Sequence, residues 1–253
     1  MKTMSYNILC YGKDGHERER REPMVLEIIR KNNPDTFGVQ EATPEWMAAL
    51  KENIGSIYNY VGVGRDDGDD EGEYSAIFYR KDKYKAVESG TFWLSETPEK
   101  VSFGWDAACR RVCTWAVLEN IETKERYVHL NSHFDHVGVA ARKNSVDMIV
   151  SKAKEYADLP VVFTADMNVK EGSTNYNQFV DSGVLRDTKF AAPDSMNYCT
   201  YHDTKPQKHT DDVIDYVMIN EHFEALSYRV VTEGIDGRFV SDHYPIYSDL
   251  KLK

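Results

Sequence analysis

The sequence predicts one α/β (α+β) domain in which two mixed or antiparallel sheets pack face to face and helices cover their outer faces. Three observations support this fold class. Strand-like runs fill much of the chain and are often joined by short turns, helical segments recur between some of them, and no linker, internal repeat or change of composition divides the 253 residues. A chain of this length can bury a large apolar core, so we assign residues 1–253 to one domain.

The chain is expected to open with a strand, a helix and a second strand. Residues 3–11 alternate and are rich in strand formers, which predicts a strand. Residues 17–33 carry apolar side chains at helical spacing, and Pro34 ends that helix because proline cannot continue its hydrogen-bond ladder. A short apolar run at 35–42 predicts the second strand, with Glu41 near its end.

The next helix, at residues 43–55, carries its own start and stop signals. Thr43 is the predicted N-cap, Pro44 occupies the first helical position, and Gly55 follows the last turn. Several strand-like runs separated by turn residues come next and predict a meander of antiparallel strands. These runs are 58–65, 74–80, 84–95, 111–119 and 125–135.

The last part of the chain alternates helices and strands again. Residues 138–157 place apolar side chains on one face of a helix, and 175–183 predict a short helix that ends at Gly183. Further strands are predicted at 159–168, 211–220, 223–233 and 244–252. Because so many neighbouring strands are joined by turns, we expect mixed or antiparallel sheets with the helices outside.

Composition narrows the class of protein further. The formal net charge is −11 and the pI is near 5.2, which is typical of an acidic soluble protein. No run of about 18 apolar residues predicts a membrane span, and no signal peptide is recognised at the start. We therefore expect a cytoplasmic protein with reduced thiols on its four cysteines, or a secreted or periplasmic one if a leader has been removed. The sequence makes no prediction of oligomeric state.

Polar residues recur where the apolar runs stop. A single aspartate at a strand end usually caps a turn, but here carboxylates, amides and histidines repeat at one run after another. The set comprises Asn7, Glu41, His133, Asp166, Asn168, Asp215, Asp242 and His243. Hard oxygen donors of this kind suit Mg²⁺ or Mn²⁺, and Mg²⁺ keeps several waters that substrate phosphate oxygens can replace.

Asp166 and Asn168 lie two residues apart at the end of an apolar run. If both belong to the strand, their side chains point to the same side of the pleat. One of them could then accept a proton while the other donates a hydrogen bond.

Six segments, in order from residue 4 to residue 247, resemble the endonuclease/exonuclease/phosphatase superfamily, which includes deoxyribonuclease I, abasic-site endonucleases and inositol polyphosphate 5-phosphatases. The segments are "MSYNIL", "FGVQE", "LNSHFDHVGVAAR", "VVFTADMN", "VIDYVMI" and "VSDHYPI". The stretches "TFWLSETPE" and "RVCTWAVLE" further resemble a bacterial branch whose members are mostly uncharacterised. The resemblance implies a deoxyribonuclease I-like, four-layer α-β-β-α sandwich.

The same resemblance implies a metal site and a base. Glu41 would be the principal ligand of Mg²⁺, with Mn²⁺ as an alternative, and Asn7 and Asp242 would lie beside it. Asp166 would orient and deprotonate the attacking water, and Asn168 would hold that water or a phosphate oxygen.

The remaining residues would contact the phosphate. His243 would hydrogen-bond it or serve as the base, with Asp215 fixing the tautomer of the imidazole. His133 would donate to a non-bridging oxygen. Arg111 occupies the position of a phosphate-contacting arginine, with Arg110 as the competing choice.

These expectations lead to a divalent-metal-dependent phosphoesterase that acts on a small phosphorylated molecule such as a sugar phosphate, a nucleotide or a phospholipid headgroup. The alternative is a nuclease that cleaves DNA or RNA with the same site, and a third reading is a binding module without activity. The run "RDDGDDEGE" at 65–73 predicts an exposed, mobile acidic loop, which would repel polyanions if it lies near the cleft. A small substrate is therefore favoured over nucleic acid.

Overall fold

The computed structural model describes residues 1–11, 17–205 and 212–253, and in these residues two sheets lie face to face. One sheet has seven strands in the order β10-β12-β13-β1-β2-β4-β3, and the other has six in the order β5-β6-β7-β8-β11-β9. The strands of the first sheet are β1 (Lys2–Asn7), β2 (Thr36–Gln40), β3 (Tyr58–Val61), β4 (Ile77–Arg80), β10 (Asp194–Ser195), β12 (Phe223–Val230) and β13 (Ile246–Leu252). Those of the second sheet are β5 (Tyr84–Trp93), β6 (Val112–Asn120), β7 (Arg126–His133), β8 (Val161–Asp166), β9 (Arg186–Asp187) and β11 (Asp215–Ile219).

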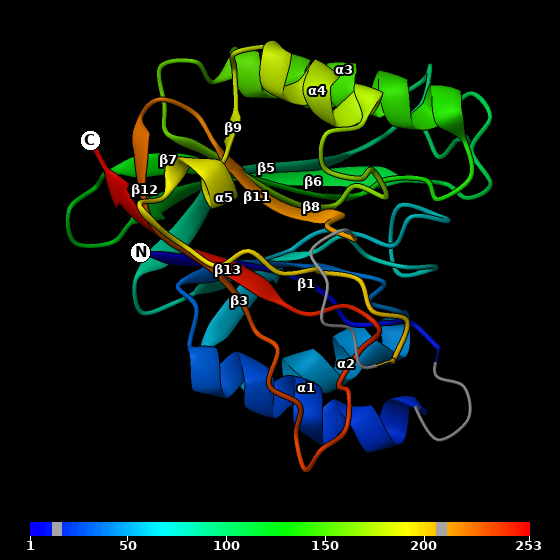
Figure 1. Cartoon of the computed structure of the whole chain (residues 1–253), viewed down its shortest axis with the longest axis vertical. Coiled ribbons are helices and arrows are strands. Elements are labelled where there is room, and N and C mark those ends of the chain that lie inside the picture. The colour runs from blue at the N-terminus through cyan, green and yellow to red at the C-terminus, as the bar shows by residue number, and fades with distance from the viewer. Residues whose placement is uncertain (12–16, 206–211) are drawn as a thin grey trace.

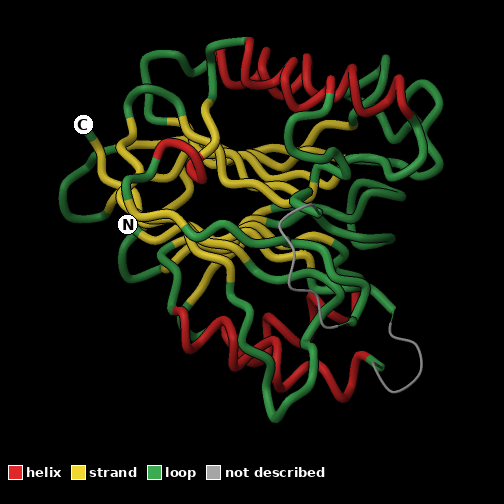
Figure 2. Tube along the Cα trace, in the orientation of Figure 1, coloured by secondary structure: helices red, strands yellow, loops and turns green. Residues whose placement is uncertain are grey.

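Helices cover both outer faces and complete the four predicted layers (Figure 1). Helices α1 (Arg18–Asn32) and α2 (Pro44–Ile54) lie on the first sheet, and α3 (Val139–Glu155) and α4 (Thr174–Asp181) lie on the second. Figure 2 shows the two layers of strands between these outer layers of helices. The α-β-β-α sandwich predicted from the sequence is therefore confirmed.

The local signals of α2 act as predicted. The Thr43 side chain accepts a hydrogen bond from the backbone N–H of Trp46, Pro44 is the first helical residue, and Gly55 follows the last one. Helix α1 ends at Asn32, and its C-cap Asn33 has a left-handed backbone (φ 45°) that turns the chain just before Pro34. These caps fix where the two helices end.

Three short elements were absent from the sequence prediction. These are β9, the one-turn helix α5 (Thr188–Ala191) and β10, and they lie between the predicted helix at 175–183 and the predicted strand at 211–220. Segments of two to four residues are too short to carry a hydrophobic period, so pattern alone does not find them.

Strand direction brings the ends of several strands to one edge of the sandwich. Strands β1 and β2 are parallel, and so are β7 and β8, in which His133 pairs with Asp166. Strand β11 is antiparallel to β8 and starts opposite its end, with Asp215 paired to Asp166. Strand β13 is antiparallel to β1, so the chain just before β13 also reaches the edge where β1 ends at Asn7.

A polar network joins the two sheets behind that edge. The Asn131 side chain accepts hydrogen bonds from Gln40 (2.7 Å) and Thr164 (2.9 Å) and donates to the carbonyl oxygens of Val39 and Ala76. Because Asn131 and Thr164 belong to the second sheet and the other three residues belong to the first or its flank, the network fixes the sheets against each other.

No helix among the described residues is long and apolar enough to cross a lipid bilayer.

Candidate active site

Most of the polar residues predicted at strand ends line one pocket of about 450 Å³ at this edge. Glu41, His133, Asp166, Asn168, Asp242, His243 and Arg111 all contribute to its wall. Asn7 and Asp215 lie directly behind the wall, where each is hydrogen-bonded to a residue of the pocket. The structure thus brings together all eight strand-end residues and Arg111, but Arg110 does not line the pocket and instead pairs with Asp66.

Asn7 connects the two sheets inside the site. Its amide nitrogen donates to Glu41 Oε1 and to Asp166 Oδ2, both at 2.9 Å. Its amide oxygen accepts the backbone N–H of Leu9 at 3.0 Å. In this orientation Asn7 positions the carboxylates of Glu41 and Asp166. Its amide oxygen would face a cation only if the amide group were flipped by 180°.

Asn168 reaches the pocket in a different way from the one predicted. Strand β8 ends at Asp166, and Asn168 has a left-handed backbone (φ 47°), so the two residues do not share a side of the pleat. The tight turn instead lets the backbone N–H of Asn168 donate to Asp166 Oδ1 at 2.9 Å. The Asn168 amide nitrogen then lies 3.1 Å from His133 Nε2 and donates to Phe134 O at 3.0 Å.

Asp166 is held in a buried, polar setting. Burial raises the pKa of the Asp166 carboxyl to about 7, and the positive charge of His243 opposes that shift. His243 Nε2 lies 3.7 Å from Asp166 Oδ2, and His243 Nδ1 lies 2.8 Å from Asp215 Oδ2. Although burial alone disfavours the imidazolium, the carboxylates of Asp215 and Asp166 raise the pKa of His243 well above its ordinary value.

Glu41 is prepared as an anion. It follows the last residue of β2 and has a left-handed backbone (φ 60°). Burial opposes the charge, but the backbone N–H of Cys10 and the amide of Asn7 outweigh it and lower the pKa of Glu41. A carboxylate that stays ionised in a partly buried place is suited to hold a cation.

The donor set fits a divalent cation. Ligand atoms of Glu41, His133 and Asp166 lie within 4.8 Å of one another, and so do those of Asp166, Asp215 and His243. Asp242 lines the same pocket but belongs to neither group, and burial raises the pKa of its carboxyl. Carboxylates and histidines together make up the set, and both are common ligands of divalent cations.

The same pocket offers hydrogen-bond donors to an anion. Arg111 is only 5 % exposed, yet its Nε and Nη1 atoms have no hydrogen-bond partner among the described residues. His133 Nδ1 likewise has none, and burial together with the Arg111 charge lowers the pKa of His133 well below its ordinary value. Asp135 lies 3.5 Å from Arg111 Nε and steadies the guanidinium.

Glu73 is a residue of the site that sequence reasoning missed. It closes the acidic run at 65–73 and lines the pocket, where two hydrogen bonds of 2.6 and 3.1 Å join its carboxylate to Arg65. Glu73 Oε2 lies 4.0 Å from His133 Nδ1. Burial raises the pKa of Glu73, with Glu41 adding to the shift and Arg65 opposing it. In the sequence Glu73 is one of six acids in a polar run, so nothing separated it from solvated neighbours.

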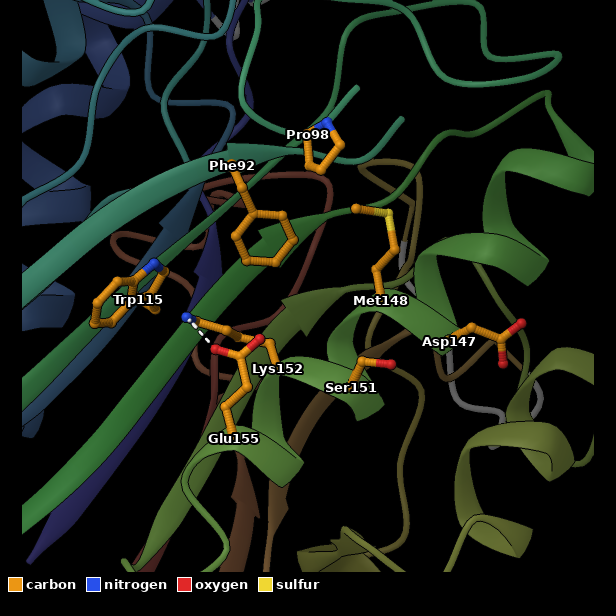
Figure 3. A pocket seen from close by; sticks show the side chains of 8 residues that line it. All are labelled: Phe92, Pro98, Trp115, Asp147, Met148, Ser151, Lys152 and Glu155. Atoms are coloured by element: carbon orange, nitrogen blue, oxygen red, sulfur yellow. Dashed lines mark hydrogen bonds and ion pairs between the residues drawn. The ribbon is translucent and has the colours of Figure 1, made fainter. Parts of the chain in front are cut away.

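A second hollow of about 440 Å³ lies elsewhere, between α3 and the outer face of β5 and β6. Figure 3 shows Phe92, Trp115 and Met148 around it, with Lys152 turned toward Glu155. The Lys152 Nζ atom lies 4.1 Å from the centre of the Trp115 ring. This hollow contains none of the strand-end residues, so the first pocket is the candidate active site.

The sandwich with this polar pocket at one edge defines a protein of the deoxyribonuclease I-like class. A profile of the Endonuclease/Exonuclease/phosphatase family matches residues 4–243, and the chain belongs to that family. Members of the family hydrolyse phosphate esters and generally use divalent metals. A search of curated proteins gave no match.

Two similar solved structures come from Bacteroides thetaiotaomicron. One is an endonuclease/exonuclease/phosphatase family protein with 34 % identity, coverage of 100 % of this chain and 98 % of that chain, and a TM-score of 0.95. The other is a mannosyl-6-phosphatase with 34 % identity, coverage of 100 % of both chains and a TM-score of 0.91.

More distant structures share the fold alone. TDP2 from D. rerio, complexed with a single-strand DNA product, has 18 % identity over 99 % of this chain and 98 % of that chain, with a TM-score of 0.75. The human Nocturnin catalytic domain with a bound sulfate anion has 17 % identity over 100 % of this chain and 94 % of that chain, with a TM-score of 0.77.

Proposed function

We propose that this chain is a divalent-metal-dependent phosphatase that hydrolyses compact phosphate monoesters, with sugar phosphates as the first candidates. The observation that carries the proposal is a pocket that combines the carboxylates of Glu41 and Asp166 with buried Arg111, whose Nη1 atom has no hydrogen-bond partner among the described residues. The 34 % identical mannosyl-6-phosphatase, which is covered over its whole length, supports the choice of sugar phosphate.

The residues of the pocket would bind either the cation or the phosphate of the substrate. Glu41 would hold the cation, with Asp166 and Asp242 close by. A bound cation supplies positive charge that stabilises the phosphate oxygens in the transition state. His133 Nδ1 and Arg111 Nη1 would bind further oxygens of the same phosphate.

Asp166 is the better general base of the two candidates. Its pKa of about 7 lets it take a proton from water near neutral pH. The raised pKa of His243 keeps that imidazole protonated, so His243 Nε2 would donate a hydrogen bond to the phosphate and Asp215 would hold the ring. The carboxylate therefore accepts the proton and the imidazolium stabilises charge.

A phosphate-release screen tests the proposal. Purified protein with Mg²⁺ is assayed on sugar phosphates, including mannose 6-phosphate, on nucleotides and on oligonucleotides, with Asp166→Asn as the blank. We expect release from at least one compact monoester and a loss of roughly 10³-fold or more in the blank. If plasmid or oligonucleotide cleavage were far faster than turnover of every small ester, the alternative assignment as a nuclease would replace this one.

A further inference from the structure

We propose that the acidic loop at 65–73 selects compact substrates by repelling extended polyanions from the mouth of the pocket. This inference rests on the proposed function, because it concerns which phosphate esters reach the same site. It is carried by where the loop is anchored, by how its backbone is held, and by the donors for an anion that lie inside the pocket.

Both ends of the loop are part of the pocket wall. Arg65 at one end and Glu73 at the other line the pocket, and two hydrogen bonds join their side chains. Next to Arg65, the Asp66 side chain pairs with Arg110 at 3.3 Å. Arg110 directly precedes Arg111, which lines the pocket. The carboxylates between the two ends therefore lie beside the opening.

Hydrogen bonds tie the loop at several points, and most of its acidic side chains are exposed, as predicted. The Asp67 carboxylate accepts the backbone N–H groups of Asp69 and Glu71 at 2.8 and 3.0 Å. The Tyr74 hydroxyl donates to Asp69 O at 3.1 Å, and the indole N–H of Trp93 donates to Arg65 O at 2.8 Å. Fixed charges act on an approaching ligand without first having to be ordered.

The outward charges are mostly unopposed. Of the six carboxylates, Glu73 is paired with Arg65 and Asp66 with Arg110. Asp69, Asp70 and Glu71 are exposed, and their side chains make no hydrogen bond or ion pair within the described parts of the chain. Their charges therefore face the solvent.

Inside the pocket, donors for an anion lie among the carboxylates. Buried Arg111 presents Nη1, which has no hydrogen-bond partner among the described residues, while its Nε is paired with Asp135. Together with His133 Nδ1, which also has no hydrogen-bond partner there, this atom marks a place for an anion. A compact monoester concentrates its charge on the one phosphate that reaches these donors. A polynucleotide brings further phosphates past the pocket, and charges still act on one another over a Debye length of about 10 Å at moderate salt.

The test compares three proteins, all carrying Asp166→Asn so that the probe is not cleaved. One has the unchanged loop, one has Asp69→Asn, Asp70→Asn and Glu71→Gln, and the control has Glu122→Gln, Asp158→Asn and Glu221→Gln. The control removes the same charge from exposed positions at the opposite end of the sandwich, near the starts of β7 and β8 and the end of β11. Binding of a fluorescein-labelled 12-nucleotide single-stranded DNA is measured by fluorescence anisotropy.

We expect the variant with Asp69→Asn, Asp70→Asn and Glu71→Gln to bind the DNA about fivefold more tightly than the protein with the unchanged loop at roughly 50 mM salt. The gain in affinity should shrink at roughly 300 mM salt. The affinity of the control for the DNA should change less than twofold. In the protein with intact Asp166, the three loop substitutions should also change kcat/KM for the compact monoester less than twofold. Equal gains in both charge variants, or no gain with the three loop substitutions, would overturn the inference. If the triple variant does not fold, Asp70→Lys replaces it, because reversing one charge should raise the DNA affinity more than neutralising one.

The two proposals fail in distinguishable ways. Absence of phosphate release from every compact monoester would reject the proposed function. The DNA binding comparison needs no turnover, so it decides the role of the loop independently.

Discussion

The Asp215 carboxylate lies 2.8 Å from His243 Nδ1, and both side chains are buried at the junction of β11 with the segment before β13. Because Nδ1 is engaged by Asp215, His243 presents Nε2 toward Asp166 and the pocket. One carboxylate thus fixes the ring while the other faces its reactive nitrogen, an arrangement that also orients histidines in hydrolytic triads.

Replacing Asp215 by Asn should remove the charge that supports the imidazolium while keeping the shape of the side chain. We expect kcat to fall by roughly 10²–10⁴-fold with little change in KM, because the interaction strengthens as charge develops on the phosphate. Steady-state kinetics on the best monoester from the screen, with circular dichroism as a control for folding, measure this. A normal kcat in a folded Asp215→Asn protein would rule out the pair as a catalytic unit.

Glu73→Gln should weaken catalysis although the residue is remote in sequence from the strand-end motifs. The change removes the charge that pairs with Arg65 and lies near His133. By analogy with groups that orient ligands in other sites, a loss of about tenfold in kcat is expected. The matched test is a double-mutant cycle with Arg65→Gln, since the two residues should show coupled effects. Strictly independent effects would mean that Arg65 and Glu73 do not act as a pair.

Metal binding can be tested by stability as well as by activity. EDTA should stop turnover and Mg²⁺ or Mn²⁺ should restore it. Mg²⁺ should also raise the Tm of the wild-type protein, because a ligand that binds only the folded state stabilises it. Glu41→Gln should abolish the rise in Tm, whereas Glu52→Gln, at an exposed position on α2, should retain it. Full activity in EDTA, or an unchanged Mg²⁺ effect on Glu41→Gln, would contradict the assignment of Glu41.

The sequence predicted the layers and the convergence of the polar residues because both follow from strand direction and length. Asp166 ends the apolar strand β8 and Asn7 belongs to the predicted strand at 3–11, so their placement at one edge follows from the order of the strands. The prediction that Asn168 and Asp166 share one side of the pleat is wrong, because a local turn gives Asn168 a left-handed backbone. Hydrophobic periodicity does not reveal such a turn. Glu73 was missed because its return to the pocket depends on a loop conformation held by tertiary hydrogen bonds.

Gly38 lies in the contact between the two sheets, where no side chain fits. A Cβ atom there would lie 2.2 Å from Asn131 Oδ1 and 2.3 Å from Thr164 Oγ1. Gly38→Ala should therefore lower the free energy of unfolding by about 3 kcal/mol, because overpacking forces the network apart. Urea denaturation measures the loss. In the double variant with Asn131→Ala the loss should be smaller than the sum of the two single losses, and simple additivity would show that the clash is relieved elsewhere.

Asp187 gives the fold a pH dependence that is separate from catalysis. Its side chain is 4 % exposed, accepts the Tyr176 hydroxyl at 3.0 Å and the backbone N–H of Lys189 at 2.8 Å, and its pKa is raised by burial to about 6. Between the unfolded pKa near 3.8 and this value the folded protein holds a proton that the unfolded chain has lost. The stabilising contribution is therefore complete below pH ~4 and is lost as the pH rises through ~6, by up to about 3 kcal/mol.

Asp187→Asn should remove this dependence, because the amide has no proton to lose and its oxygen can still accept the Lys189 N–H. Relative to the wild-type protein, the variant should gain free energy of unfolding as the pH rises from 4 to 7, as measured by urea denaturation at each pH. Asp181→Asn on the exposed end of α4 is the matched control and should run parallel to the wild type. If the difference between Asp187→Asn and the wild type stayed constant with pH, or shrank as the pH rose, Asp187 would have to be ionised in the fold at little cost, and burial would not control its charge.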